Sequence, residues 1–124
     1  MKLNHVNLPV HDVEAARDFF VRYFGLVTVQ EVGKNFLAIL RDDNGLVLNL
    51  SHFDKKSTAE VDYHKDFHIG FFVESREEAD RIYQSLVADE VATEAPSRRE
   101  SRYGFYVTAP GGIVVEVACM EWRT

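Results

Sequence analysis

Two stretches of this chain share one pattern, and this repeat limits the folds that the chain can adopt. Residues 45–51 and 112–118 each contain a glycine, three aliphatic residues, one polar residue, one aliphatic residue and one small residue. An apolar, partly β-branched run of this kind is typical of a buried strand. The polar residue is Asn49 in the first stretch and Glu116 in the second. Because an unpaired buried carboxylate is costly, Glu116 should have a cation, a metal ion or a strong donor beside it.

The repeat extends upstream of both stretches. Residues 3–10 align with residues 66–73, so that His5 falls on His68. The chain is therefore predicted to contain two copies of one unit, each with one polar position in its first strand and another in its last. These positions are His5 and Asn49 in the first copy, and His68 and Glu116 in the second.

Each copy is predicted to have the order β-α-β-β-β. In the first copy, Asp12 can cap a helix that ends near Phe24 at Gly25. In the second, Ser75 opens a capping box, and a helix runs to about Val87. The expected strands are residues 3–10, 26–32, 36–41 and 46–51, then 67–73, 91–95, 103–108 and 113–118, with a basic loop at 96–102.

Strand alternation places the aliphatic residues of the four repeated strands on one face, which should receive the helices. The opposite face then carries the four polar residues, and two curled sheets would turn them toward a shared cleft. The prediction is an α+β fold, in which two βαβββ modules form a curled mixed sheet around a cleft with the helices outside. The 124 residues make one domain, with module 1 at about 1–51, a linker at about 52–65 and module 2 at about 66–120.

The composition excludes several classes of protein. A net charge of -6 argues against nucleic acid or an anionic membrane as the main partner. No apolar run approaches the length that spans a membrane. A single cysteine excludes an intrachain disulfide framework, and no signal-peptide pattern opens the chain, so we expect a cytoplasmic protein.

With these motifs the chain resembles the vicinal oxygen chelate superfamily, which includes glyoxalase I, bleomycin-resistance proteins and extradiol dioxygenases. The resemblance covers nearly the whole chain. It rests on residues 3–6 with the later Asp12, on residues 20–26, and on residues 110–116. These marks are fairly specific for the superfamily and poorly specific for one of its members.

The resemblance implies metal ligands on the first and last strands of each module. Carried over, the ligands are His5, His68 and Glu116, with Asn49 as a weaker fourth position that departs from the acid or glutamine found in some members. Two imidazoles and a carboxylate leave open positions on a divalent ion, which suits zinc, nickel, manganese or iron. Glu116, the predicted catalytic residue, can stay a ligand or detach to act as a base. The simpler interpretation is that Glu116 forms a salt bridge with Arg102 or Arg41.

Three functions remain open at this point. The first is a metal-dependent enzyme of lyase, isomerase, thiol-transferase or dioxygenase type that acts on a small oxygen-rich substrate. Arg102, Tyr103 and Asn49 are its predicted substrate-binding residues. The second is a non-catalytic protein that binds a drug or another small molecule, as bleomycin-resistance proteins do. The third is a structural or regulatory module in which the ligand residues no longer have a role. Family members of this size usually form homodimers, which we expect here as well, and Trp122 is a candidate for docking on a partner.

Overall fold

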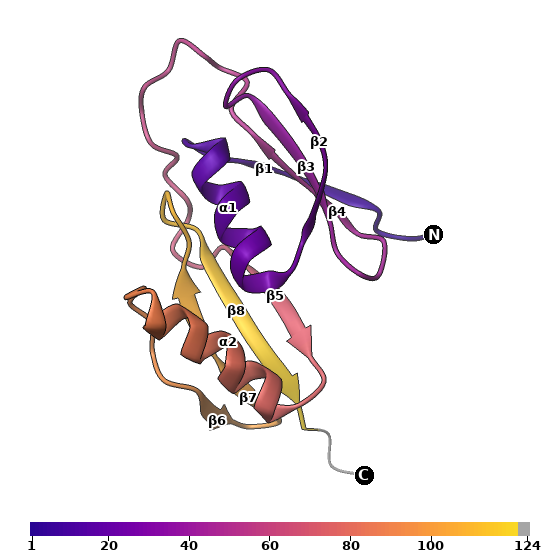
Figure 1. The fold of residues 1–124 in the computed structure, drawn as a ribbon, viewed down its shortest axis with the longest axis vertical. Helices are drawn as coiled ribbons and strands as arrows, with labels where there is room; N and C mark the ends of the chain where they lie inside the picture. Colours follow the sequence, from indigo (N-terminus) through magenta and orange to yellow (C-terminus); the bar gives the residue numbers. More distant parts are fainter. Residues whose placement is uncertain (122–124) are drawn as a thin grey trace. The chain divides into compact units, whose positions relative to one another are not determined.

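The computed structural model describes residues 1–121, so Trp122 lies outside the described residues (Figure 1). The chain divides into a first unit, Met1–Asp62, and a second unit that begins at Tyr63. The first unit contains β1 (His5–Pro9), α1 (Val13–Phe24), β2 (Val27–Val32), β3 (Leu37–Arg41) and β4 (Val47–Ser51). The second contains β5 (His68–Val73), α2 (Arg76–Ala88), β6 (Ser97–Arg99), β7 (Arg102–Thr108) and β8 (Val114–Met120).

Each unit forms its own four-stranded mixed sheet. The strand orders are β1-β4-β3-β2 and β5-β8-β7-β6, so the last strand of each unit lies between its first and third strands. The first and last strands run parallel, and the remaining pairs are antiparallel. The predicted α+β fold of two βαβββ modules is confirmed.

The two sheets also share their residue register. Asn7 lies opposite Asn49 in the first unit, and Gly70 lies opposite Glu116 in the second. Asn7 and Gly70 are equivalent in the sequence repeat, as are Asn49 and Glu116. The repeat therefore describes how the strands pair, and it places Asn49 and Glu116 at the same point of their respective sheets.

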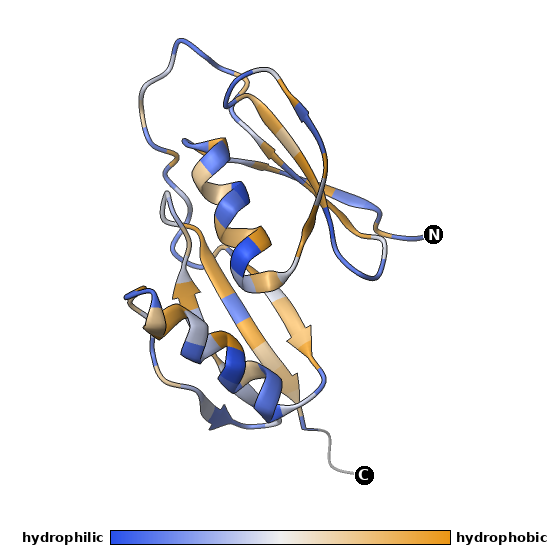
Figure 2. Cartoon of the chain, viewed as in Figure 1, coloured by the Kyte–Doolittle hydropathy of each residue, from blue (hydrophilic) through white to orange (hydrophobic). Residues whose placement is uncertain are grey.

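The apolar faces of the strands form the cores of the units, as alternation predicts. In the first unit, Leu8 and Leu50 are almost fully buried, and α1 packs against β3 and β4. In the second, Val115 and Val117 are fully buried, and α2 packs against β7 and β8. Figure 2 shows that β8 is hydrophobic except for a hydrophilic segment within it. That strand contains Glu116, one of two buried polar residues among those described.

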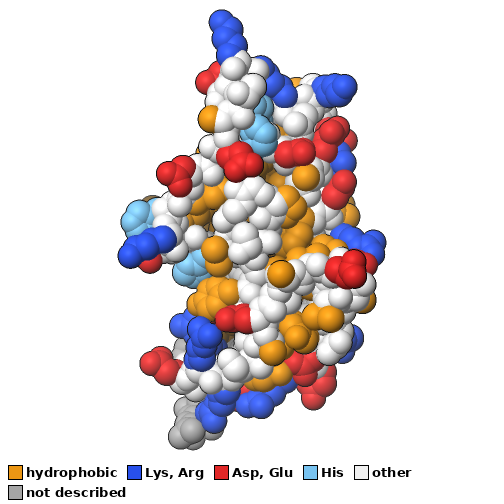
Figure 3. All heavy atoms as spheres, turned by 90° about the vertical axis from the view of Figure 1, so that its left-hand side faces the viewer, with side chains coloured by type: hydrophobic (Ala, Val, Ile, Leu, Met, Phe, Trp, Pro, Cys, Tyr) orange, Lys and Arg blue, Asp and Glu red, His pale blue; other side chains and the backbone are white. Residues whose placement is uncertain are grey.

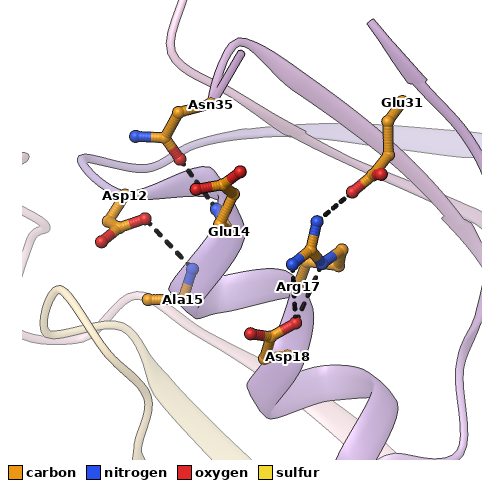
Figure 4. Close-up of polar contacts among 7 residues, drawn as sticks. All are labelled: Asp12, Glu14, Ala15, Arg17, Asp18, Glu31 and Asn35. Carbon is orange, nitrogen blue, oxygen red and sulfur yellow. Dashed lines mark hydrogen bonds and ion pairs between the residues drawn. The ribbon is translucent and has the colours of Figure 1, made fainter.

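Helix α1 begins and ends where the sequence predicts. The Asp12 carboxylate accepts a hydrogen bond from the Ala15 N–H at 3.1 Å (Figure 4). Gly25 ends the helix with φ 67°, a left-handed conformation that favours glycine. The Asn35 side chain, from the turn before β3, accepts a second N–H of the first helical turn, that of Glu14, at 2.8 Å. Side chains therefore satisfy two of the helix's free N–H groups.

Helix α2 carries a variant of the predicted capping box. Ser75 Oγ accepts the N–H of Glu78 at 3.1 Å, as expected. The Glu78 carboxylate reaches back to the N–H of Glu74 at 3.2 Å, one residue before the cap. In the usual box, this carboxylate returns to the cap residue itself.

The strand expected at residues 91–95 was wrong, and so was the basic loop expected at residues 96–102. Within the first segment only Thr93 forms a bridge, with Val107. Two side chains also bond to β7: Thr93 Oγ1 donates to Tyr106 O at 2.9 Å, and the Glu94 carboxylate accepts the Tyr106 N–H at 3.2 Å. The edge strand β6 forms after Pro96 instead, in a hairpin with β7. Its exposed residues include two arginines, which suit an unpaired sheet edge.

No helix in residues 1–121 is long and apolar enough to cross a membrane.

Candidate functional site

Glu116 is the centre of the polar face of the second sheet. Strand β8 lies between β5 and β7, so Glu116 has Gly70 on one side and Tyr106 on the other. Its side chain is only 12% exposed. Gly70 has no side chain to cover the carboxylate, and a Cβ built there would lie 3.7 Å from Glu116 Oε1. The sheet therefore holds a nearly buried carboxylate next to a position without a side chain.

The two oxygens of this carboxylate have different partners. Arg102 Nη1 donates to Oε2 at 2.7 Å, and this hydrogen bond raises the pKa of Arg102. His68 Nε2 lies 3.6 Å from Oε1. The side chains of both partners are nearly half exposed, at 46% for Arg102 and 43% for His68. The salt bridge to Arg102 expected from the simpler interpretation is thus present, and one carboxylate oxygen still faces an imidazole.

A pocket of about 270 Å³ opens on this face of the second unit. It is lined by Glu94, Ser97, Arg99, Glu100, Arg102, Gly104, Phe105, Tyr106 and Glu116. Arg99 lies 3.5 Å from the Glu94 carboxylate, with its guanidinium 5.8 Å from the centre of the Tyr106 ring. Cations and carboxylates are interleaved around the pocket, so it suits a small polar ligand better than an apolar one.

Tyr106 was not identified from the sequence. It pairs with Glu116 across β7 and β8, and its ring meets the His68 ring edge-on, with centroids 5.9 Å apart. Burial, followed by the charge of Glu116, raises its pKa. Counting strand positions would have found Tyr106, because it is four residues from Arg102 and therefore on the same face.

The structure does not bring Tyr103 to this site. Its hydroxyl donates to Asp80 of α2 at 2.5 Å, and the Arg76 guanidinium lies 4.7 Å from its ring centre. The hydrogen bond to Asp80 raises its pKa. Tyr103 therefore fastens α2 to the opposite face of the sheet, and Tyr106 is the tyrosine beside Glu116.

The first unit carries the other two predicted residues on the equivalent face. His5 is exposed, and its Nδ1 lies 3.1 Å from Asn4 Oδ1. Asn49 Oδ1 is buried and has no hydrogen-bond partner among the described residues. An amide oxygen without a donor in such a place is costly, and a ligand or water that donates to it would remove that cost.

A second pocket, of about 360 Å³, lies within the first unit. The linker covers one end of the strands there, and His52 and Phe53 line the pocket together with Asn7 and Ser51. No periodic pattern is present in the sequence of this segment. A ring contact between His11 and His52, with centroids 5.8 Å apart, helps to position the start of the linker.

The residues fit a divalent metal ion only in part. His68 and Glu116 are close enough to share one ion, since ligand bonds of about 2 Å bring two donor atoms to within about 3–3.5 Å of each other. In residues 1–121, no three His, Cys, Asp or Glu side chains form a group that could hold a metal. The second unit by itself thus offers a pair of candidate ligands, and His5 of the first unit stays a predicted third.

Two four-stranded βαβββ units, the second with a His and a Glu on its polar face, define a class of paired-module proteins. The profile of the Glyoxalase/Bleomycin resistance protein/Dioxygenase superfamily matches residues 2–117, and the chain belongs to this family. The predicted resemblance is confirmed.

Solved structures share this fold. A structure described as a possible glyoxalase from Bacillus cereus is 42% identical, with a TM-score of 0.84, and the match covers 96% of this chain and 99% of that one. Lactoylglutathione lyase from Agrobacterium tumefaciens is 22% identical, with a TM-score of 0.74 over 95% of this chain and 92% of that one. A fosfomycin resistance protein from Listeria monocytogenes is 19% identical, with a TM-score of 0.77 over 96% and 93%. None of the curated proteins compared with the chain matches it.

Proposed function

We propose that this protein is a divalent-metal-dependent enzyme that acts on a small, oxygen-rich substrate. The observation that carries the proposal is the position of His68 Nε2, 3.6 Å from a nearly buried Glu116 oxygen beside a polar pocket. The family includes glyoxalases and dioxygenases, so the reaction is of lyase, isomerase, thiol-transferase or dioxygenase type.

In this proposal His68 and Glu116 hold the ion together with His5. A bound ion of zinc, nickel, manganese or iron supplies Lewis-acid stabilisation of substrate oxygens. Arg102, which lines the pocket, binds an anionic oxygen of the substrate. Glu116 either remains a ligand or accepts a proton from the substrate, as its position next to the pocket allows.

Asn49 is assigned a substrate-binding role in the first unit. Its unpartnered, buried Oδ1 is an acceptor, and a substrate hydroxyl or a bound water is the matching donor. Tyr103 is left out of the proposed site because its hydroxyl is bonded to Asp80 on the helix side.

The alternative is a non-catalytic small-molecule-binding protein of the bleomycin-resistance type. The specific observation in its favour is the Arg102–Glu116 salt bridge at 2.7 Å, which neutralises the carboxylate without any metal. Under this alternative the pocket of the second unit binds a ligand by charge and hydrogen bonding alone.

The metal content of untagged protein decides between the two proposals. We expect close to one divalent ion per chain by plasma mass spectrometry in the wild type, and loss of that ion in Glu116→Gln, which keeps the side-chain shape but not the charge. Absence of metal from the wild type, even after incubation with zinc, nickel, manganese and iron, would favour the non-catalytic alternative. A positive result justifies assays of glyoxalase, epimerase, dioxygenase and thiol-transfer activity.

The proposal also includes a homodimer located in the cytoplasm, with a small molecule rather than nucleic acid or a membrane as its partner. Exposed apolar side chains support self-association: Val29 is 56% exposed and Phe72 is 80% exposed. Figure 3 shows hydrophobic side chains scattered among charged ones on one face of the molecule.

A further inference from the structure

The salt bridge between Arg102 and Glu116 occupies the carboxylate that the proposed function assigns to a metal ion. Arg102 reaches Glu116 from β7, and its Nη1 donates to Oε2 at 2.7 Å. The guanidinium and a divalent ion are both cations that bind carboxylate oxygens. We propose that Arg102 is an internal counter-ion that competes with the metal for Glu116 and moves away when the metal binds. This inference rests on the proposed function.

The exposed fractions of the two side chains indicate that Arg102, and not Glu116, is the partner that moves. The Glu116 side chain is 12% exposed and belongs to β8, which has a neighbouring strand on each side. The Arg102 side chain is 46% exposed and lies at the first residue of β7, directly after the turn from β6. Water can therefore solvate the guanidinium when it leaves the carboxylate, whereas Glu116 has no comparable freedom.

Charge explains why the two cations do not share Glu116 easily. A divalent ion bound between His68 and Oε1 would lie within a few ångströms of the guanidinium, and at this distance like charges repel strongly in a partly buried site. The repulsion outweighs the hydrogen bond, so Arg102 lowers the affinity of the site for metal.

The pocket offers Arg102 a second position. Arg102 is one of its lining residues, as is Glu100, which lies in the β6–β7 turn beside it. After release, the guanidinium can present its N–H groups to an anionic substrate oxygen instead of to Glu116. In the absence of metal the same side chain neutralises a carboxylate that would otherwise be buried and unpaired.

The test compares zinc binding and stability in full-length, metal-stripped protein. Arg102→Met removes the charge and keeps much of the apolar side chain, while Arg102→Lys keeps the charge. By isothermal calorimetry with zinc chloride, we expect Arg102→Met to bind zinc about tenfold more tightly than the wild type, and Arg102→Lys to stay close to it. Without metal, the Tm of Arg102→Met should fall by a few degrees, because Glu116 loses its counter-ion.

These opposite changes separate competition from a merely structural role, which would weaken zinc binding and stability together. The double variant Arg102→Met/Glu116→Gln should lose the gain in affinity if the competition is for Glu116. Equal or weaker zinc binding by Arg102→Met, with zinc still bound by the wild type, would overturn the inference and leave the proposed metal site standing. If neither protein binds zinc, nickel, manganese or iron, the proposed function itself fails, and the competition fails with it.

Discussion

Gly104 is the residue at which the second sheet tolerates a side chain least. A Cβ built at this position would lie 1.8 Å from the carbonyl oxygen of Val117 on the neighbouring strand. This is far closer than van der Waals contact, and the carbonyl belongs to the backbone, so β7 and β8 would have to separate. Gly104 thus allows the close strand pairing that holds Arg102 and Tyr106 next to Glu116.

We predict that Gly104→Ala lowers the free energy of unfolding by about 3 kcal/mol, the upper part of the range for overpacked sites. Urea denaturation followed by circular dichroism measures the change. Gly70→Ala is the matched control, because its Cβ would make only an ordinary 3.7 Å contact with Glu116. Equal stabilities of the two variants would show that the strands adjust to a methyl group at position 104 without cost.

At this scale the sequence predicted the central residues of the candidate site but not all of their neighbours. The cost of burying Glu116 required a partner, and Arg102 was one of the two arginines considered. Tyr103 was predicted to bind substrate together with Arg102, although adjacent strand residues point to opposite faces. Whether His5 joins His68 and Glu116 at a metal stays a prediction.

Among the secondary-structure elements, α1 offers a direct test of capping. Asp12→Ala removes the acceptor of the Ala15 N–H and should lower the free energy of unfolding by about 1 kcal/mol. Asp12→Asn keeps an oxygen acceptor and should lose less. Chemical denaturation of both variants measures the difference, and an alanine variant as stable as the asparagine one would show that the Asn35 contact to Glu14 is enough to begin the helix.

The end of β8 is fastened to α2 through a cluster of charges, and this contact should depend on pH. Arg76 forms a two-point ion pair with Glu121, and Arg98 lies 3.7 Å from the same carboxylate. The hydrogen bond from Arg76 lowers the pKa of Glu121 below its ordinary value. The folded state therefore favours the ionised carboxylate. The resulting stability is present above the unfolded-state pKa of about 4.3 and is lost as the pH falls through the folded-state value.

We predict that the stability difference between the wild type and Glu121→Gln shrinks as the pH is lowered from about 6 to about 3. Urea unfolding at a series of pH values measures it. In the background of Arg76→Gln the difference should be smaller and depend less on pH. A difference that stays constant through the acidic range would mean that Glu121 titrates alike in the folded and unfolded chains.

The elements themselves were predicted best where local signals agreed. Asp12, Gly25 and Ser75 marked helix ends because their roles depend on a few neighbouring backbone groups. The strand prediction for residues 91–95 was wrong. Their apolar content is typical of a strand, whereas in the structure Thr93 and Glu94 bond to β7 through their side chains. These side-chain bonds depend on β7, which follows later in the chain, so the local sequence does not predict them.

For the whole molecule, the repeat predicted the architecture because both copies pair their strands in the same order and register. It could not predict the pockets to the same degree. The linker that lines the first pocket has no periodic pattern, and Lys55 fixes part of it by donating to the carbonyl oxygens of Lys34 and Asn35, both at 2.7 Å. Contacts between residues this far apart in the sequence form only in the folded chain, so the sequence alone does not predict them.

We predict that the protein is a dimer at micromolar concentration. The exposed side chain of Phe72 is the kind of apolar surface that an interface buries. Multi-angle light scattering measures the mass, which we compare with twice the 14.2 kDa of one chain. Phe72→Lys should weaken a dimer that uses this surface. A wild-type mass of a single chain would contradict the prediction.

The side-chain oxygen of Asn49, which has no hydrogen-bond partner within residues 1–121, implies a trade-off between stability and ligand recognition. An aliphatic residue such as Leu at this position would replace a buried acceptor that lacks a donor with a side chain that needs none. The substituted protein should then resist heat better while losing an acceptor for the donors of a bound molecule. Asn49 is therefore a residue that folding stability alone would not favour. A bound ligand that donates a hydrogen bond to its oxygen would offset the stability that it costs.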